Sequence, residues 1–408
     1  MSTPDIRRKH IRLLDSFTIL SRVSVAALLY LTSSYLPLFD ASPHTVVAPS
    51  STLPSFSSSL LRWDAFHFTA IAKARYSRDH HWAFFPGVPS LLRFAASFSP
   101  PVADPAFALA RVALIHVVIA IPTTRAIYNL TLIHFGSPSF AFLTALLSLL
   151  PASPVTLYFA PYAEPIFTFL SYAGMFACAC RQYLRATLYF TVAAAFRSNG
   201  VLLALYVPWS LIVHPFLLSS TLPSLGVVFT ALFHATLPLL PSLFHQRDAY
   251  RVFCLTPAAN HAQQPSWCNN PIPSIYTHVQ RAYWNVGFLS YWTPSQLPNI
   301  ALALPLIVPL LFYSIPHTLS LLRGKRLGGL RPLTTAAHSV HAAFLGTTLL
   351  TSAHTQIALR LLPALPSMYW AAAALLVERP RWGRAYVVWV VLWGATSIVL
   401  WAAFLPPA

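Results

Sequence analysis

Acidic side chains are scarce in this chain, and their scarcity narrows the search for a group that could act as a base. Only nine of the 408 residues are acidic: Asp5, Asp15, Asp40, Asp64, Asp79, Asp104, Glu164, Asp248 and Glu378. Three of them lie among Arg and Lys beside apolar segments, and three more are typical of loop or cap positions. The candidates that remain are Asp64, Asp79 and Glu164.

Asp64 follows Arg62 and Trp63 and precedes "AFHFTAIA", whose apolar residues predict a helix lying along a membrane surface. A carboxylate against aromatic and apolar neighbours keeps a basicity useful for taking a proton from a sugar hydroxyl. The same position also suits an Asp that caps the helix. The spacing alone leaves both roles open, with Asp64 as the leading candidate for a base.

A second polar cluster, Asp79 with His80 and His81, opens the later segment "RDHHWAFFPG". These groups stand against an aromatic wall and suit the binding of a phosphate or a sugar. His and Asp residues on a surface usually have no such role, so the cluster by itself is weakly specific. Metal binding by the two His residues is disfavoured, because adjacent side chains rarely point at one ion. We therefore predict no metal site.

Further charged groups begin or interrupt apolar runs. Glu164 in "YAEP" either caps a helix or touches a substrate. Arg197 and Asn199 in "FRSNG" lie between two apolar runs, where polar groups face a cavity or form a buried structural network. Arg360 and Gln356 in "QIALR" stand one helical turn apart. The Arg fork matches phosphate oxygens, although a snorkelling interface residue would have the same pattern.

Aromatic and amide side chains are concentrated in "HVQRAYWNVGFLSYW". They suit the faces and hydroxyls of a sugar, and they equally suit a Trp/Tyr belt at a membrane interface. The candidates in this segment are Gln280, Arg281, Tyr283, Trp284, Asn285 and Trp292. The sequence contains no Gly-rich phosphate loop and no "DxD" triplet, so nothing indicates a nucleotide or a bound divalent cation.

The elements that position these groups are membrane-spanning helices. The chain is 56% hydrophobic and only 9% charged, against about 25% charged in an ordinary soluble domain. Apolar stretches recur along nearly the whole length, and a span of the hydrocarbon core needs about 20 residues, which gives roughly ten to twelve crossings. The predicted fold class is an all-α polytopic membrane protein.

The formal net charge is +17, and the basic residues lie mainly between the predicted spans. They do not form the single aromatic-interleaved face of a nucleic-acid-binding protein. The clusters "RRKHIR", "RGKR" and "ERPRWGR" are predicted to be cytoplasmic by the positive-inside rule. The first precedes an apolar segment without a convincing cleavage site, which indicates an uncleaved anchor with a cytosolic N-terminus.

This orientation places residues 37–83 and 245–296 as two large loops on the non-cytoplasmic side. Cys254 and Cys268 lie in the second loop, where a disulfide and two free thiols are both open. The other two cysteines are predicted to be reduced packing residues. The spans are drawn near residues 16–36, 105–121, 127–152, 163–180, 183–196, 200–214, 220–243, 297–322, 335–352, 365–378 and 385–405.

Several of these segments together resemble a known family. "RWDAFHFTAIA", "DHHWAFFPGVP", "YAEPIFTFLSY", "AFRSNGVLLALY", "WCNNPIPSIYTHVQRAYWNVGFLSYWTPSQLPNIALALP" and "QIALRLLPALPSMYW" occur in that order. The chain therefore resembles the PIG-V-type family of GPI mannosyltransferases, which add the second mannose to the glycosylphosphatidylinositol (GPI) anchor precursor. The resemblance covers about residues 16–405.

The resemblance implies a single GT-C-type glycosyltransferase domain over residues 1–408, in the endoplasmic reticulum membrane. Such an enzyme takes mannose from dolichyl phosphate mannose and forms an α-1,6 bond on the luminal side. The donor is β-linked and the product α-linked, so one inverting displacement suffices. A side chain that activates the acceptor and cations that stabilise the phosphate then replace a metal. The phosphate candidates are Arg62, His80, Arg281 and Arg360.

In this family an acidic residue of the first luminal loop is the presumed base, and Trp63-Asp64 matches its pattern. Asp79 stands where relatives often carry Glu, and His81 where many carry Asn, so the second polar cluster departs from the family. Yeast members work with a small accessory membrane protein, which implies a partner subunit beside the GPI glycolipid precursor.

Two other functions fit a polytopic chain. A transporter or lipid scramblase would gather its polar groups at the midplane, often between inverted repeats. Here the polar residues collect in two loops on one side, and no internal repeat is visible. Another dolichyl-phosphate-mannose-dependent mannosyltransferase would share the chemistry but change the acceptor, and the segment at residues 267–305 favours the second-mannose enzyme.

Overall fold

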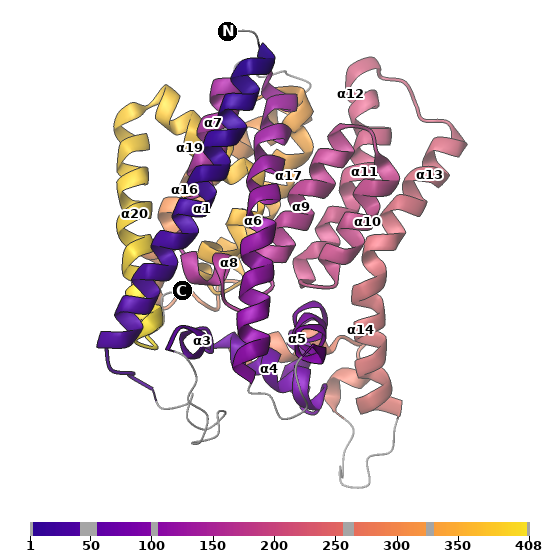
Figure 1. The fold of residues 1–408 in the computed structure, drawn as a ribbon. Helices are drawn as coiled ribbons and strands as arrows, with labels where there is room; N and C mark the ends of the chain where they lie inside the picture. Colours follow the sequence, from indigo (N-terminus) through magenta and orange to yellow (C-terminus); the bar gives the residue numbers. More distant parts are fainter. Residues whose placement is uncertain (1–2, 41–54, 99–104, 256–264, 324–329, 406–408) are drawn as a thin grey trace.

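A computed structural model describes residues 3–40, 55–98, 105–255, 265–323 and 330–405. Within these ranges the chain forms helices and connecting turns without a β-strand (Figure 1). The helices are α1 Thr3–Tyr35, α3 Ser55–Ser59, α4 Asp64–Ala74, α5 Gly87–Ser97, α6 Pro105–Phe135, α7 Pro138–Leu147, α8 Pro154–Tyr158, α9 Glu164–Ala179, α10 Tyr183–Ala194, α11 Tyr206–Pro208, α12 His214–Ser219, α13 Leu225–Thr236, α14 Leu240–Tyr250, α15 Ile275–Trp284, α16 Leu297–Leu322, α17 Ala336–Thr351, α18 Ala358–Leu361, α19 Pro366–Glu378 and α20 Pro380–Ala402. Three short 3₁₀ helices also matter for the site: η1 Asp79–Ala83, η2 Ser198–Leu205 and η9 Thr355–Ile357.

Six helical segments of the described chain are long and apolar enough to cross a membrane, which confirms the all-α, polytopic class. They are Pro4–Tyr35, Ala108–Phe135, Ser198–Ser219, Leu225–Leu255, Pro294–Leu322 and Pro380–Ala402. A seventh span results if Thr355–Ala364 and Pro366–Glu378, which meet at 93°, are counted as one bent crossing.

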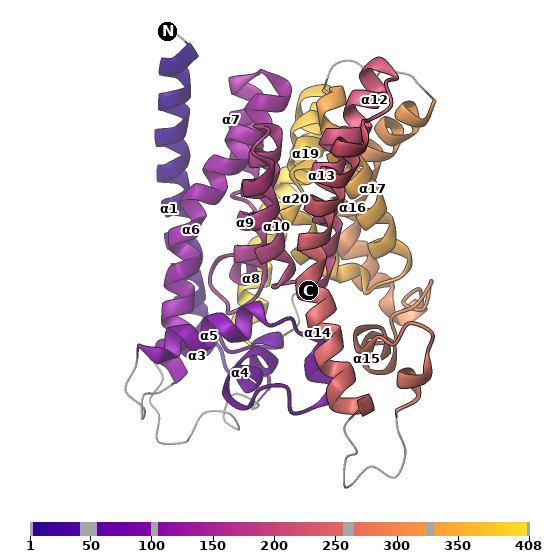
Figure 2. The same ribbon diagram turned by 90° about the vertical axis from the view of Figure 1, so that its right-hand side faces the viewer.

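The sequence predicted more crossings than these six or seven. Several predicted spans fold as helices of only 10 to 16 residues, namely α7, α9, α10, α17 and α19. They lie within the same bundle as the long helices (Figures 1 and 2). Hydropathy locates apolar residues but does not fix where a helix ends, so short bundle helices and full spans have the same pattern.

The division predicted between residues 121 and 127 is wrong, because α6 continues through Pro122 to Phe135. Proline removes one backbone donor from a helix, and neighbouring hydroxyl groups can bond to the carbonyl groups of that turn. Thr123 donates to the carbonyl of Ile119 at 2.6 Å, and Thr124 donates to the carbonyl of Ala120 at 3.1 Å. A single long helix therefore replaces the first of the two predicted spans and part of the second.

The buried core of the bundle packs large aromatic rings against small residues. Phe190 of α10 is 1% exposed and lies against Gly174 of α9. A Cβ at Gly174 would overlap the Phe190 ring, so α9 and α10 approach this closely because the position is glycine. A contact of this kind fixes the spacing of two helices that begin and end close to the site.

Helices α3, α4, α5 and α14 lie at one end of the bundle, opposite the N-terminus (Figure 1), and α15 lies beside α14 at the same end (Figure 2). We call this the α4 end. It contains the described parts of residues 37–83 and 245–296; residues 41–54 and 256–264 of these loops, and most of the "RGKR" cluster, lie outside the described residues. Trp82 from the first loop and Trp267 from the second belong to one buried apolar cluster, so the two loops pack together.

Candidate functional site

Four charged residues from distant parts of the chain meet at the α4 end. Arg360 of α18 donates from Nη2 to Oδ2 of Asp64 at 2.9 Å and from Nε to Oε1 of Glu164 at 2.8 Å. Nη1 of Arg197 lies 2.6 Å from the same Glu164 oxygen. We call these four side chains the ionic cluster; it contains two acidic residues, Asp64 and Glu164, and two basic residues, Arg197 and Arg360.

Local backbone structure places the two acids at helix starts. Asp64 is the first residue of α4, and Glu164 is the first residue of α9. The residues before them, Trp63 and Ala163, occupy the cap positions and make no side-chain cap bond. Both acids lie in the first turn of their helices, where a carboxylate is favourable, and both also form ion pairs.

Tyr162 holds the turn that carries Asp64. Its hydroxyl accepts a hydrogen bond from the Asp64 backbone N–H at 3.0 Å and donates to the Arg62 carbonyl at 3.2 Å. The guanidinium of Arg360 lies over the Tyr162 ring, 4.6 Å from its centroid. Nothing in the sequence distinguished Tyr162 from the other 16 tyrosines, apart from its place two residues before Glu164.

Exposure differs sharply within the ionic cluster. The Glu164 side chain is 2% exposed, those of Arg360 and Arg197 are 13% and 14% exposed, and that of Asp64 is 33% exposed. A buried carboxylate needs compensating partners, and Glu164 has two. Asp64 is therefore the most exposed residue of the ionic cluster, and Glu164 is the most buried.

One oxygen of Asp64 and one nitrogen of Arg360 remain available. Within the described chain, the hydrogen bonds of Asp64 use Oδ2 and its backbone N–H, and no residue donates to Oδ1. Arg360 likewise uses Nε and Nη2, while no described residue accepts from Nη1. The pair thus offers an acceptor for a proton beside a donor for an anionic oxygen.

The second polar cluster lies in the same end of the molecule. Oδ2 of Asp79 accepts from the Tyr283 hydroxyl at 2.7 Å, and Oδ1 accepts from the His80 backbone N–H at 2.8 Å. Burial raises the pKa of Asp79, but these bonds and nearby His80 outweigh burial and hold the pKa below its usual range. Burial also lowers the pKa of His81 to about 4, with His80 and His67 adding to the effect.

Other predicted site residues lie outside the ionic cluster. Arg62 is 2% exposed and donates to the carbonyls of Ser58 and Leu61 at 2.7 and 2.9 Å. Burial lowers its pKa to about 10. Its guanidinium therefore supports the backbone before α4 and does not face the open side of Asp64. Trp63 is 36% exposed and stacks on Phe404 with ring centroids 5.0 Å apart.

The candidates of the second loop lie on or beside α15. Gln280, Arg281 and Trp284 are on the helix, and Asn285 ends it with a φ of 48°. His354 makes a 2.6 Å hydrogen bond to the Trp284 carbonyl, which joins α15 to the segment that leads to Arg360. These residues border the second polar cluster through Tyr283.

Asn199 and Gln356 are close in sequence to members of the ionic cluster but are not hydrogen-bonded to them in the described chain. Asn199 lies in η2, two residues after Arg197, and Gln356 lies in η9, before α18. Neither makes a hydrogen bond to the four charged residues of the cluster within the described chain. The residue after Arg197, Ser198, links this segment to α15, because its hydroxyl donates to the Tyr276 hydroxyl at 2.8 Å.

Cys254 and Cys268 form a disulfide, with their Cα atoms 5.7 Å apart, so the alternative of two free thiols is not observed. Cys178 and Cys180 are free, as predicted, and Cys178 is buried. The disulfide joins Cys254, which follows α14, to Cys268, which precedes α15, and Cys268 shares a buried apolar cluster with Trp82 of η1.

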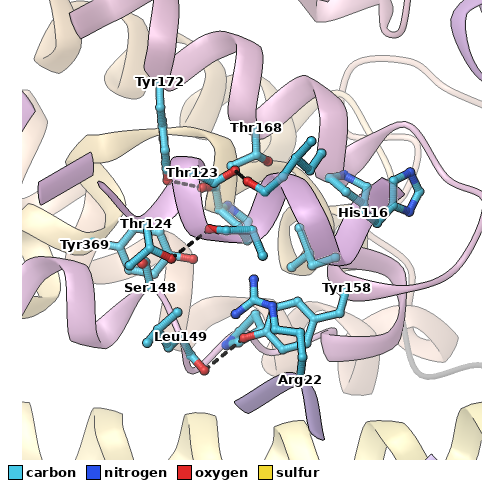
Figure 3. Close-up of a pocket in the computed structure, with 16 residues that line it drawn as sticks. Arg22, His116, Thr123, Thr124, Ser148, Leu149, Tyr158, Thr168, Tyr172 and Tyr369 are labelled. Atoms are coloured by element: carbon cyan, nitrogen blue, oxygen red, sulfur yellow. Dashed lines mark hydrogen bonds between the residues drawn. The ribbon is translucent and has the colours of Figure 1, made fainter. Parts of the chain in front are cut away.

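A separate polar cavity of about 40 Å³ lies within the bundle and was not foreseen from the sequence (Figure 3). Arg22 of α1 lines it, with its guanidinium 3.6 Å from the centroid of the Tyr158 ring. Further lining groups include His116, Ser148 and Tyr369. A space of this size holds a few water molecules at most, so it is too small for a sugar.

The fold and the site together define a polytopic, all-α membrane protein with an ionic cluster at one end of its bundle. The chain belongs to the family described as Mannosyltransferase (PIG-V), whose sequence model matches residues 11–408. It is therefore an enzyme, a glycosyltransferase of the mannosyltransferase type.

Three relatives illustrate the similarity. GPI mannosyltransferase 2 of Cryptococcus neoformans var. neoformans serotype D (strain JEC21) is 33% identical, covering 95% of this chain and 96% of the relative. GPI mannosyltransferase 2 of Yarrowia lipolytica is 31% identical, covering 96% and 99%. GPI alpha-1,6-mannosyltransferase 2 of Rattus norvegicus is 30% identical, covering 83% and 78%. Among solved structures, the archaeal oligosaccharyltransferase AglB from Archaeoglobus fulgidus matches with a TM-score of 0.43 and 11% identity, covering 94% of this chain and 55% of that one.

Proposed function

We propose that this chain transfers the second mannose from dolichyl phosphate mannose to the GPI-anchor precursor, in an α-1,6 bond, at the luminal face of the endoplasmic reticulum membrane. The names of the relatives support the GPI acceptor and the linkage. The observation that carries the chemistry is the Asp64–Arg360 pair, which has one free carboxylate oxygen and one free guanidinium nitrogen.

In the proposed reaction, Oδ1 of Asp64 takes the proton of the acceptor hydroxyl. The acceptor oxygen then bonds to the anomeric carbon of mannose as the bond from that carbon to the phosphate oxygen breaks. Dolichyl phosphate leaves with the bonding electron pair, and the proton on Asp64 passes to water. A β-linked donor gives an α-linked product in this single displacement, so no covalent enzyme intermediate is needed.

Arg360 has two roles in this proposal. Its contact with Asp64 orients the carboxylate, and Nη1 stabilises the charge that develops on the departing phosphate. Glu164 and Arg197 do not touch the reacting atoms. They act as positioning residues, because the buried Glu164 carboxylate fixes the Arg360 guanidinium from the protein side.

The test is mannose transfer by membranes from cells that lack the second-mannose step and express this chain. Wild-type protein should restore the step, and the glycolipid with a single mannose should disappear. Asp64→Asn should reduce transfer by about 10²- to 10⁴-fold, the usual contribution of general base catalysis. Asp64→Asn transfer at a near-normal rate would remove Asp64 from the role of base.

The matched control is Asp15→Asn. Asp15 also pairs with an arginine, Arg125, at 2.5 Å, but it lies in the N-terminal half of α1, away from α4. This variant should keep near-wild-type transfer. Restoration of a different mannosylation step by the wild-type chain would show that the chemistry is right and the acceptor wrong.

We further propose that the reaction needs no divalent metal, since Arg360 supplies the positive charge that a metal gives to nucleotide-sugar transferases. Purified protein should keep full activity in excess chelator. Loss of activity that manganese restores would contradict this. The proposed small accessory subunit is tested by purifying tagged protein in mild detergent and analysing the sample for a small membrane companion.

A further inference from the structure

Three histidines gather beside the ionic cluster, at a place where the sequence argued against a metal site. They are His67 of α4 and His80 and His81 of η1, and their nitrogen ligand atoms lie within 4.8 Å of one another. His80 and His81 are adjacent in the 3₁₀ helix η1. Both of its imidazoles approach His67, which comes from a different helix.

The three rings are arranged edge to face. The centroid of His67 lies 5.4 Å from that of His80 and 6.2 Å from that of His81, with interplanar angles of 78° and 71°. The His80 and His81 centroids are 4.7 Å apart at 80°. Rings in this arrangement do not stack on each other, and their ligand nitrogens lie within 4.8 Å of one another.

The distances require only a small closure to hold an ion. Zinc–nitrogen bonds of 2.0–2.1 Å place tetrahedral ligand atoms about 3.3 Å apart, so the nitrogens must approach by about 1.5 Å at most. His67 and His80 are half-buried, whereas His81 is 5% exposed. Nδ1 of His81 is buried without a hydrogen-bond partner in the described chain, so a nitrogen without a partner is already present on the most buried ring.

Asp79 supplies the orienting group that metal-binding histidines usually have. Its Oδ1 lies 3.6 Å from Nδ1 of His80, which is within ion-pair distance but longer than a hydrogen bond. Tyr283 in turn holds Asp79 through its other oxygen. On the opposite side, His67 stacks on Phe84 with centroids 4.6 Å apart.

We propose that His67, His80 and His81 form a binding site for a divalent transition metal ion, for which zinc is the best match. Three imidazoles select Zn²⁺, Cu²⁺ or Ni²⁺ over Mg²⁺ and Ca²⁺, which prefer oxygen ligands. The ion would tie η1 to α4, three residues beyond Asp64. Its role is structural, so the site is separate from the metal-independent transfer proposed above.

The test is direct zinc binding by the purified full-length chain in detergent, after treatment with chelator and desalting. Titration against a fluorescent zinc indicator should show one tightly bound ion per chain. A separate thermal unfolding measurement should show a higher midpoint with zinc than without it. His81→Asn and His67→Asn should each weaken zinc binding by more than about 100-fold. Asp79→Asn should weaken it by about 10- to 100-fold, because loss of a residue that orients a metal ligand typically lowers metal affinity by that factor.

The control is His10→Gln, which removes a histidine near the start of α1 and should leave zinc affinity unchanged. Each variant is first compared with wild type by thermal unfolding without metal, so that misfolding is recognised. Wild-type protein that takes up no zinc at micromolar concentration overturns the proposal without any variant. Equal affinity in wild type, His67→Asn and His81→Asn also overturns it.

Discussion

Arg360 binds two carboxylates at once, and this sharing makes the shape of its side chain as important as its charge. Nε donates to Glu164, and Nη2 lies 2.8 Å from Glu164 and 2.9 Å from Asp64, so the plane of the guanidinium sets the direction of both acids. A lysine would bring one compact charge on a flexible stem and could not reproduce the fork. The guanidinium is thus held by the buried Glu164 and the more exposed Asp64 together.

Arg360→Lys should therefore abolish most transfer although the positive charge is kept. Loss of one oriented donor to a developing anion costs about 10²- to 10³-fold in rate, and Asp64 would lose its orientation as well. The measurement is the initial rate of mannose transfer in membranes, normalised to the amount of protein. Arg125→Lys is the matched control, because Arg125 makes a similar fork to Asp15 at 2.9 and 2.5 Å far from α4. Wild-type rates in Arg360→Lys would show that the fork has no part in the reaction.

The sequence indicated the charged members of the site because charged side chains beside apolar runs are costly in a membrane protein and usually have a function. Asp64, Glu164, Arg197 and Arg360 each interrupt or border an apolar run, and the structure brings all four together. It could not find Tyr162, because a tyrosine in a membrane protein is as common at an interface or in a core as at a site. The approach of His67 to His80 was equally hidden, since it depends on how α4 and η1 pack.

At the scale of elements, helix spacing rests on where small residues allow close contact. Hydropathy predicted that α9 and α10 exist, but not that Gly174 would receive the ring of Phe190. It also divided α6 at Pro122, because proline usually marks an interruption and the sequence does not show that a helix continues beyond it. The contacts that decide the two cases come from the next helix in the chain and from local hydroxyl bonds.

Gly174→Ala should destabilise the bundle, because the added Cβ overlaps a ring that has no room to move. Overpacking of this kind costs about 1–3 kcal/mol, and the midpoint of thermal unfolding in detergent should fall. Gly226→Ala is the control: Gly226 is also helical, has open space around it, and should gain up to about 1 kcal/mol from helix propensity. Gly174→Ala combined with Phe190→Leu should recover part of the loss. An unchanged midpoint in Gly174→Ala alone would contradict the close contact.

At the scale of the whole molecule, the α4 end is assembled from two loops that are distant in sequence. The charge pattern predicted that residues 37–83 and 245–296 share one side of the membrane, and their described parts do lie at one end of the bundle. The pattern could not predict that Tyr283 would bind Asp79, or that Trp82 and Trp267 would share an apolar cluster. Those contacts depend on the fold of each loop, which the disulfide between Cys254 and Cys268 constrains.

This disulfide makes the proposed luminal location of the second loop measurable, because disulfides persist in the lumen and are reduced in the cytosol. Maleimide–polyethylene glycol added to the denatured chain should label only Cys178 and Cys180 before reduction and all four cysteines after it. The double variant Cys178→Ser/Cys180→Ser provides the control, with no label before reduction and two labels after. Four labels before reduction, in membranes prepared with thiols blocked, would show that the loop is reduced in the cell. That result would contradict the disulfide and remove this support for a luminal α4 end.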